Sequence, residues 1–188
     1  MSIVKLGAAP LAYPQPVFIL GTYDHYGIAN AMNVAWGGVT GKNEITLCCS
    51  VKHKTTTNFL RSSCLTVSMG TVETAEICDY LGLVSGDDVR DKVARCGLHA
   101  ERSEVIYAPV FKELPLCFHC KVIHYEPRTG HLELKVLETT ADESILTDGK
   151  IDAEKLRPIT FDPSSHTYRP LGASIGAAFS MGNALKDK

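Results

Sequence analysis

The segment Lys52–Asn58, which reads Lys-His-Lys-Thr-Thr-Thr-Asn, places cationic and hydroxyl side chains where an apolar strand gives way to an expected helix over 55–62. The first N–H groups of a helix have no partner within the helix and carry partial positive charge, so they bind anions. Thr55, Thr56 and Thr57 would add donors and Lys54 a full charge, which together suit one phosphate monoester. The alternative is an ordinary threonine N-cap beside solvated lysines, and spacing alone favours this alternative.

A second segment, residues 30–38, places an amide beside small residues. Strand alternation predicts Met32, Val34 and Trp36 on one face and Asn33 and Ala35 on the other. A small residue lets a flat ring approach the backbone, and an amide can bond the edge of that ring. Trp36, the only tryptophan, is on pattern alone better explained as an ordinary core residue.

A third segment runs from Gly82 to Lys92. Ser85 followed by Asp88 forms a capping box for an expected helix over 87–95. Gly82 and Gly86 would also let the backbone approach a ligand closely. Capping and ligand binding are compatible, so this segment alone decides little.

Other kinds of chemistry find no support in the sequence. Cys117 and Cys120 lie three apart on an expected strand over 116–124, so their thiols point to opposite faces and no metal site is expected. Neither a Rossmann glycine fingerprint nor a P-loop is present. No Ser/His/Asp or Cys/His group can be assembled, and we therefore predict no catalytic side chain.

The bulk composition indicates one globular domain over residues 1–188. Hydrophobic residues make up 45% of the chain and the formal net charge is −2, which argues against a nucleic-acid partner. No run of eighteen apolar residues and no signal-peptide layout is present, so we expect a cytoplasmic protein without a membrane span. The seven cysteines are an odd, scattered set that fits a reducing compartment.

The elements that must position these segments are mostly strands. We expect strands over 17–23, 28–36, 45–51, 64–69, 116–124 and 131–137, helices over 55–62, 73–81 and 87–95, and a helical tail over 171–185. Gly37, Gly38 and Gly41 predict a loop. Because several strands meet through tight turns, the pattern favours a mainly β fold with α additions, an antiparallel barrel rather than a doubly wound sheet. Composition alone does not separate a barrel from a sandwich.

Taken in order, these segments resemble the flavin reductase-like, FMN-binding split-barrel family, especially its flavoredoxin branch. The resemblance covers nearly the whole chain. It rests on Pro16–Asp24, Gly27, Asn30, Asn33–Gly38, Lys54 with Thr56, Ser85-Gly86 with Asp91-Lys92, Gly97-Leu98, Ala108-Pro109, Tyr168 and Leu171-Gly172. Lys54 stands where the family usually has arginine, which puts bidentate phosphate contact in doubt, and Thr55 stands where an aromatic residue is common.

The resemblance implies a split β-barrel that binds FMN. It implies that the start of the expected helix over 55–62 binds the phosphate and that the end of the strand over 28–36 forms a wall for the isoalloxazine ring. The end of the neighbouring strand over 45–51 would line the same site, and the segment from Gly82 to Lys92 would supply further residues near the ligand. These cofactor-binding predictions comprise Lys54, Thr55, Thr56 and Thr57; Asn33, Val34, Ala35 and Trp36; Cys49, Ser50 and Val51; and Ser85, Gly86 and Lys92.

The family binds FMN between two protomers, so the resemblance also implies a homodimer. It implies that NAD(P)H delivers hydride to the flavin, which then reduces a second acceptor, while the protein supplies orientation and polar tuning. One alternative is a flavoredoxin-type electron carrier that a redox partner protein reduces in place of NAD(P)H. Another is a non-catalytic flavin-binding dimer.

Overall fold

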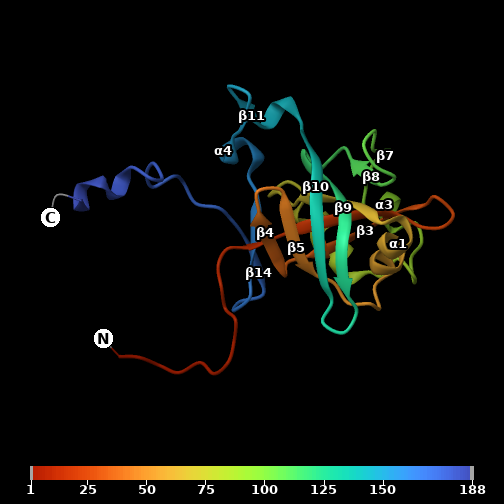
Figure 1. Ribbon diagram of the computed structural model, residues 1–188, viewed down its shortest axis with the longest axis horizontal. Helices are drawn as coiled ribbons and strands as arrows, with labels where there is room; N and C mark the ends of the chain where they lie inside the picture. The colour runs from red at the N-terminus through yellow and green to blue at the C-terminus, as the bar shows by residue number, and fades with distance from the viewer. Residues whose placement is uncertain (1, 187–188) are drawn as a thin grey trace.

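Seven antiparallel strands form one curled sheet in the computed structural model, which describes residues 2–186 (Figure 1). The strand order is β3-β2-β6-β9-β10-β5-β4. The bounds are β2 Phe18–Tyr23, β3 Ala29–Val34, β4 Gly37–Gly41, β5 Glu44–Cys48, β6 Cys64–Met69, β9 Leu116–Glu126 and β10 His131–Ala141. This is the antiparallel barrel that the strand pattern favours, in the split form that the family resemblance implies, and it settles the choice between barrel and sandwich.

The remaining elements surround this sheet. The helices are α1 Lys54–Ser62, α2 Ala75–Leu83, α3 Lys92–Arg95 and α4 Ala153–Leu156, with 3₁₀ turns η1 Glu143–Ile145 and η2 Met181–Leu185. The short strands are β1 Gln15–Pro16, β7 Ala100–Arg102, β8 Pro109–Phe111, β11 Leu146–Thr147, β12 Lys150–Ile151, β13 Ile159–Asp162 and β14 Thr167–Pro170.

Alternation along β2 divides the buried residues between the two faces of the sheet. Phe18 and Leu20 point into the barrel, where Phe59 of α1 joins the same apolar cluster. Ile19 points outward into a second cluster, to which α2 contributes Leu81. Helices α1, α2 and α3 all contact β3. The fold therefore brings the start of α1, the end of α2 and the start of α3 to one strand.

The predicted loop at Gly37–Gly41 is wrong, because these residues form β4, which pairs with β5. A Cβ atom at Gly37 would lie 2.3 Å from the carbonyl oxygen of Thr46, and its φ of +154° also disfavours a side chain. The glycines thus permit a close strand pairing, with a register shift between Val39 and Gly41.

Two predicted strands end earlier than expected. β3 ends at Val34, and the chain bends at Trp36, whose carbonyl accepts the N–H of Cys48 at 2.9 Å. Met32 and Val34 share one face of the strand, as alternation predicts, and this face points into the barrel. Trp36 is 48% exposed, so its interpretation as an ordinary core residue is wrong. β5 ends at Cys48. The N–H of Cys49 still donates to the carbonyl of Gly130, which precedes the partner of Cys48 on β10, and the chain then turns toward α1.

Two predicted helices are much shorter than expected. Residues 84–91 form turns, and only Lys92–Arg95 is helical, so the capping box of Ser85 and Asp88 does not form. The tail beyond β14 is helical only at η2, and residues 171–183 are all exposed (Figure 1). Without a buried face, a tail with three glycines has nothing to stabilise a long helix. No helix among residues 2–186 is both long and apolar enough to cross a membrane.

Candidate functional site

A pocket of about 200 Å³ lies beside β3, between the start of α1 and the turns that follow α2. The strand contributes Asn30, Met32 and Asn33 to its wall. The two helix ends and the turns contribute the other lining residues, which are His53, Lys54, Thr55, Leu81, Gly82, Leu83, Val84, Ser85, Gly86 and Lys92.

Lys92 is the most unusual residue of this pocket, because only 2% of it is exposed. Its ammonium donates to the carbonyls of Val84 at 2.6 Å and Leu81 at 3.3 Å. It forms no ion pair within residues 2–186. Burial therefore lowers the pKa of Lys92 to about 8. An ammonium has three donors, so one remains for a ligand, and an anion would supply the missing counter-charge.

The start of α1 faces the same pocket without a side-chain cap. Its N-cap residue is His53, so the interpretation of this segment as a threonine N-cap is wrong. Desolvation, with the charge of Lys92 as a smaller cause, lowers the pKa of His53. The helix N-terminus thus keeps its affinity for anions.

Asn30 supplies an independent sign of a ligand. It is 5% exposed, and its amide nitrogen donates to Thr55 Oγ1 at 2.7 Å. Its Oδ1 is buried and has no hydrogen-bond partner among the described residues. A Cβ atom at residue 86 would lie 2.1 Å from that oxygen, so only glycine fits there. A buried acceptor without a partner is costly, and a donor group of a ligand would satisfy it.

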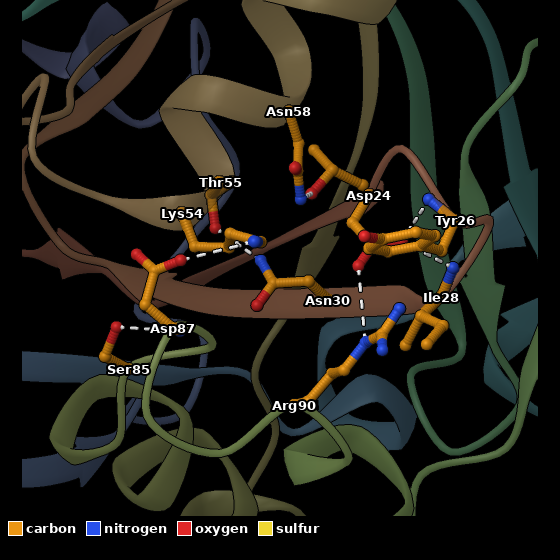
Figure 2. Close-up of polar contacts among 11 residues, drawn as sticks. Asp24, Tyr26, Ile28, Asn30, Lys54, Thr55, Asn58, Ser85, Asp87 and Arg90 are labelled. Carbon is orange, nitrogen blue, oxygen red and sulfur yellow. Dashed lines mark hydrogen bonds and ion pairs between the residues drawn. The ribbon is translucent and has the colours of Figure 1, made fainter.

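The turns over 84–91 are attached to the rest of the site at both ends (Figure 2). Ser85 Oγ accepts the N–H of Asp87 at 3.1 Å, which closes the first turn. Lys54 Nζ lies 3.2 Å from Asp87 Oδ1, and Arg90 Nε lies 3.8 Å from Asp24 Oδ2. These contacts place the backbone of Gly86 against Asn30 and complete the pocket wall.

On the other side, Asn33 is held by outer elements. Its amide nitrogen donates to the carbonyl of Cys78 at 2.9 Å and to Tyr168 Oη at 3.3 Å. Tyr168 in turn donates to Asp79 at 3.0 Å. Burial first, and then the hydrogen bond and the charge of Asp79, raise the pKa of Tyr168 to about 12. The amide of Asn33 is therefore fixed in orientation.

The pocket unites only part of the set that the sequence predicts. It brings together Asn33, Lys54, Thr55, Ser85, Gly86 and Lys92. The residues that do not line it are Val34, Ala35, Trp36, Cys49, Ser50, Val51, Thr56 and Thr57.

Thr56 and Cys49 show why some of these residues lie elsewhere. Both are fully buried, and Thr56 Oγ1 donates to the carbonyl of Ser50 at 2.8 Å. Cys49 belongs to the barrel interior, and burial raises the pKa of its thiol to about 12. Val34 likewise packs in the interior. Cys49 and Val34 therefore contribute their side chains to the barrel interior, and Thr56 uses its hydroxyl to hold the turn that leads into α1.

The cofactor-binding predictions from the sequence omit Asn30, His53 and the end of α2, although Gly82 is expected to let the backbone approach a ligand. Asn30 opens the candidate segment 30–38 and belongs to the family pattern, but it is not among the cofactor-binding predictions. Its position three residues before Asn33 on a strand gives no hint that both face one pocket, because residues three apart normally point to opposite faces. The signal appears only when the unsatisfied Oδ1 is seen beside Gly86.

Comparisons with known proteins point to one family. A family model described as "Flavin reductase like domain" matches residues 11–150. Flavoredoxin of Desulfovibrio vulgaris (Miyazaki F) is 32% identical, with a TM-score of 0.92 over 96% of this chain and 100% of that chain. Flavoredoxin from Methanosarcina acetivorans is 25% identical, with a TM-score of 0.88 over 98% and 100%.

A more distant structure shares the fold alone. Nitrilotriacetate monooxygenase component B from Bacillus cereus is 17% identical, with a TM-score of 0.75 over 94% of this chain and 98% of that chain. The search of curated proteins gave no match.

Proposed function

Because the chain belongs to the flavin reductase-like family, we propose that it binds FMN and passes electrons through that flavin. Family membership supports a general flavin-dependent oxidoreductase. The observation that carries the choice of FMN is the buried, unpaired cation of Lys92 beside Lys54 and the uncapped start of α1. Two lysines and a helix N-terminus suit a terminal phosphate monoester.

The residues present fit this cofactor. Lys54, Lys92 and the first N–H groups of α1 would hold the phosphate, and Asn30 Oδ1 would accept from a hydroxyl of the ribityl chain. Ligand pockets usually measure about 300–1,000 Å³, whereas this one measures about 200 Å³. One chain therefore holds the phosphate-bearing end of FMN, and the ring extends beyond the pocket.

We further propose a homodimer with the ring between two protomers. Trp36 is 48% exposed and Val39 is 72% exposed, although both are large apolar residues near the sheet edge. The tail carries Ile175 and Phe179, which are 91% and 105% exposed. Both termini project from the same side of the body (Figure 1). These exposed apolar side chains at a sheet edge and on the tail are available for contact with a second protomer.

When bound, the flavin supplies hydride and electron transfer, and the chain supplies binding and orientation. The finer proposal is an NAD(P)H-dependent flavin reductase of the cytoplasm. The alternative is a flavoredoxin-type carrier reduced by a redox partner protein, and the likeness to two flavoredoxins supports it. Neither function requires a catalytic side chain or a metal.

Purified protein tests the proposal directly. We expect a flavin absorption spectrum after incubation with FMN, and anaerobic addition of NADH or NADPH should bleach it. Bleaching by dithionite but by neither pyridine nucleotide would replace the reductase with the electron carrier. A protein that takes up no FMN would contradict both functions.

A further inference from the structure

We propose that Asp87 is a specificity-determining residue that competes with the ligand phosphate for Lys54. Its carboxylate pairs with the Lys54 ammonium, and a phosphomonoester that binds Lys54 must compete with this carboxylate. Asp87 would thus weaken FMN binding and lower the preference for FMN over flavin without a phosphate. This inference rests on the proposed function and assigns a role to a residue outside the pocket lining.

The geometry places Asp87 at the rim of the pocket. Its Oδ1 lies 3.2 Å from Lys54 Nζ, and its side chain is 55% exposed, compared with 23% for Lys54 (Figure 2). Lys54 lines the pocket and Asp87 does not. Lys54 is therefore the residue that both lines the pocket and pairs with Asp87.

Of the two lysines, Lys54 is the one that can change partners. Lys92 is buried and bound to two carbonyls, so its position is fixed. Lys54 is partly exposed and has one ion-pair partner. Solvent screens a pair of this kind and leaves it little net stability, so exchanging a carboxylate for a phosphate dianion is favourable.

A second attachment keeps the turns in place when the Asp87 contact is lost. Arg90 pairs with Asp24 and lies 4.3 Å from the ring centroid of Tyr26. Asp24 Oδ1 also accepts the N–H groups of Ile28 and Tyr26. Although burial opposes it, these bonds and the Arg90 charge lower the pKa of Asp24. Releasing Asp87 therefore need not displace Gly86 from Asn30.

The test compares Asp87→Asn with Asp88→Asn. Asp88 is the matched control, because it lies in the same turn, is exposed, and forms no ion pair with any residue between 2 and 186. FMN and riboflavin are titrated into each variant at low salt by flavin fluorescence. We expect Asp87→Asn to tighten FMN binding by about three- to tenfold, the size of one screened charge interaction. Riboflavin affinity should change by less than about twofold, as should both affinities in Asp88→Asn.

Other outcomes overturn the inference. The inference fails if Asp87→Asn leaves FMN affinity unchanged, weakens it, or changes the affinities for FMN and riboflavin equally. Asp87 would then stabilise the turns over 84–91 without determining ligand specificity. A fall in melting temperature larger than about 2–4 °C, equivalent to about 1 kcal/mol, would likewise assign it to stability. If the wild-type chain binds neither flavin, the proposed function itself fails, and this inference fails with it.

Discussion

The two lysines of the pocket hold their charges in opposite ways. Lys92, at the start of α3, is 2% exposed, bonds to two carbonyls and has no carboxylate partner in the described chain. Lys54, at the start of α1, is partly exposed and pairs with Asp87. The α3 side therefore carries a fixed cation that lacks a counter-ion, and the α1 side carries an exchangeable one.

This difference indicates how the site selects an anion. Burying an ammonium without a counter-charge destabilises the folded chain. A phosphate would relieve that cost at Lys92, whereas at Lys54 it only replaces one anion by another. Loss of the fixed cation should therefore have the larger effect on phosphate binding.

The largest expected effect is that of Lys92→Met. It removes a charge-assisted contact worth about 1.5–3 kcal/mol, so FMN affinity should fall by roughly 10- to 100-fold. Riboflavin affinity should fall much less, which fluorescence titration of both ligands would show. Because the substitution also removes the donor to Val84, circular dichroism should establish that the variant is folded. An equal loss for both ligands would mean that Lys92 acts by positioning the turns.

Gly86→Ala should disturb both sides of the pocket at once. Its Cβ would meet Asn30 Oδ1 at 2.1 Å, so either the turns or the buried Asn30 side chain must shift. We expect a loss of about 1–3 kcal/mol in the free energy of unfolding, measured by urea denaturation. Gly172→Ala is the control, because no atom lies within 4 Å of its Cβ position. Equal stability of the two variants would show that the turns are not held against β3.

Lys54→Ala should have a smaller effect than Lys92→Met. FMN affinity should fall by roughly three- to tenfold, because the removed cation is partly exposed and already paired. Lys54→Arg is the matched variant, since it retains the charge and should bind FMN at least as well as the wild type. If Lys54→Ala lowers FMN affinity more than Lys92→Met does, then the partly exposed lysine contributes more to phosphate binding than the buried one, which contradicts this account.

The smallest effect concerns pH. Burial lowers the pKa of Lys92 from 10.5 to about 8, so the folded chain loses this proton before the unfolded chain does. Between these values the unfolded state binds more protons, and the stability that depends on Lys92 rises with pH. FMN affinity should do the opposite and fall several-fold between pH 7 and 9.5, because the cation disappears. Titrations at both pH values should show this fall in the wild type and not in Lys92→Met.

The barrel was accessible from sequence because alternation and turn residues are local signals. Gly37 was misread because a glycine in a loop and a glycine beneath a neighbouring strand look alike until Thr46 is placed against it. The short α3 was missed for a related reason. The Arg90–Asp24 pair and the close packing of Gly86 against Asn30 position residues 84–91 as turns, and both contacts join segments far apart in the sequence.

The phosphate side of the site was likewise only partly predictable. Lys54 and Thr55 follow from a helix start, which is visible in sequence. The burial of Lys92 and the unsatisfied oxygen of Asn30 depend on how α2, α3 and β3 pack. These features arise from tertiary packing and produce no periodic pattern in the sequence.

The ratio of FMN to riboflavin affinity tests the central claim most directly. Both ligands carry the same ring and ribityl chain, so their difference reports the phosphate alone. Titration of the purified chain at pH 7, followed by flavin fluorescence, should give FMN an advantage of at least about tenfold, the contribution of one charge-assisted contact. Equal affinities for the two ligands would contradict the assignment of Lys92 and Lys54 to a phosphate.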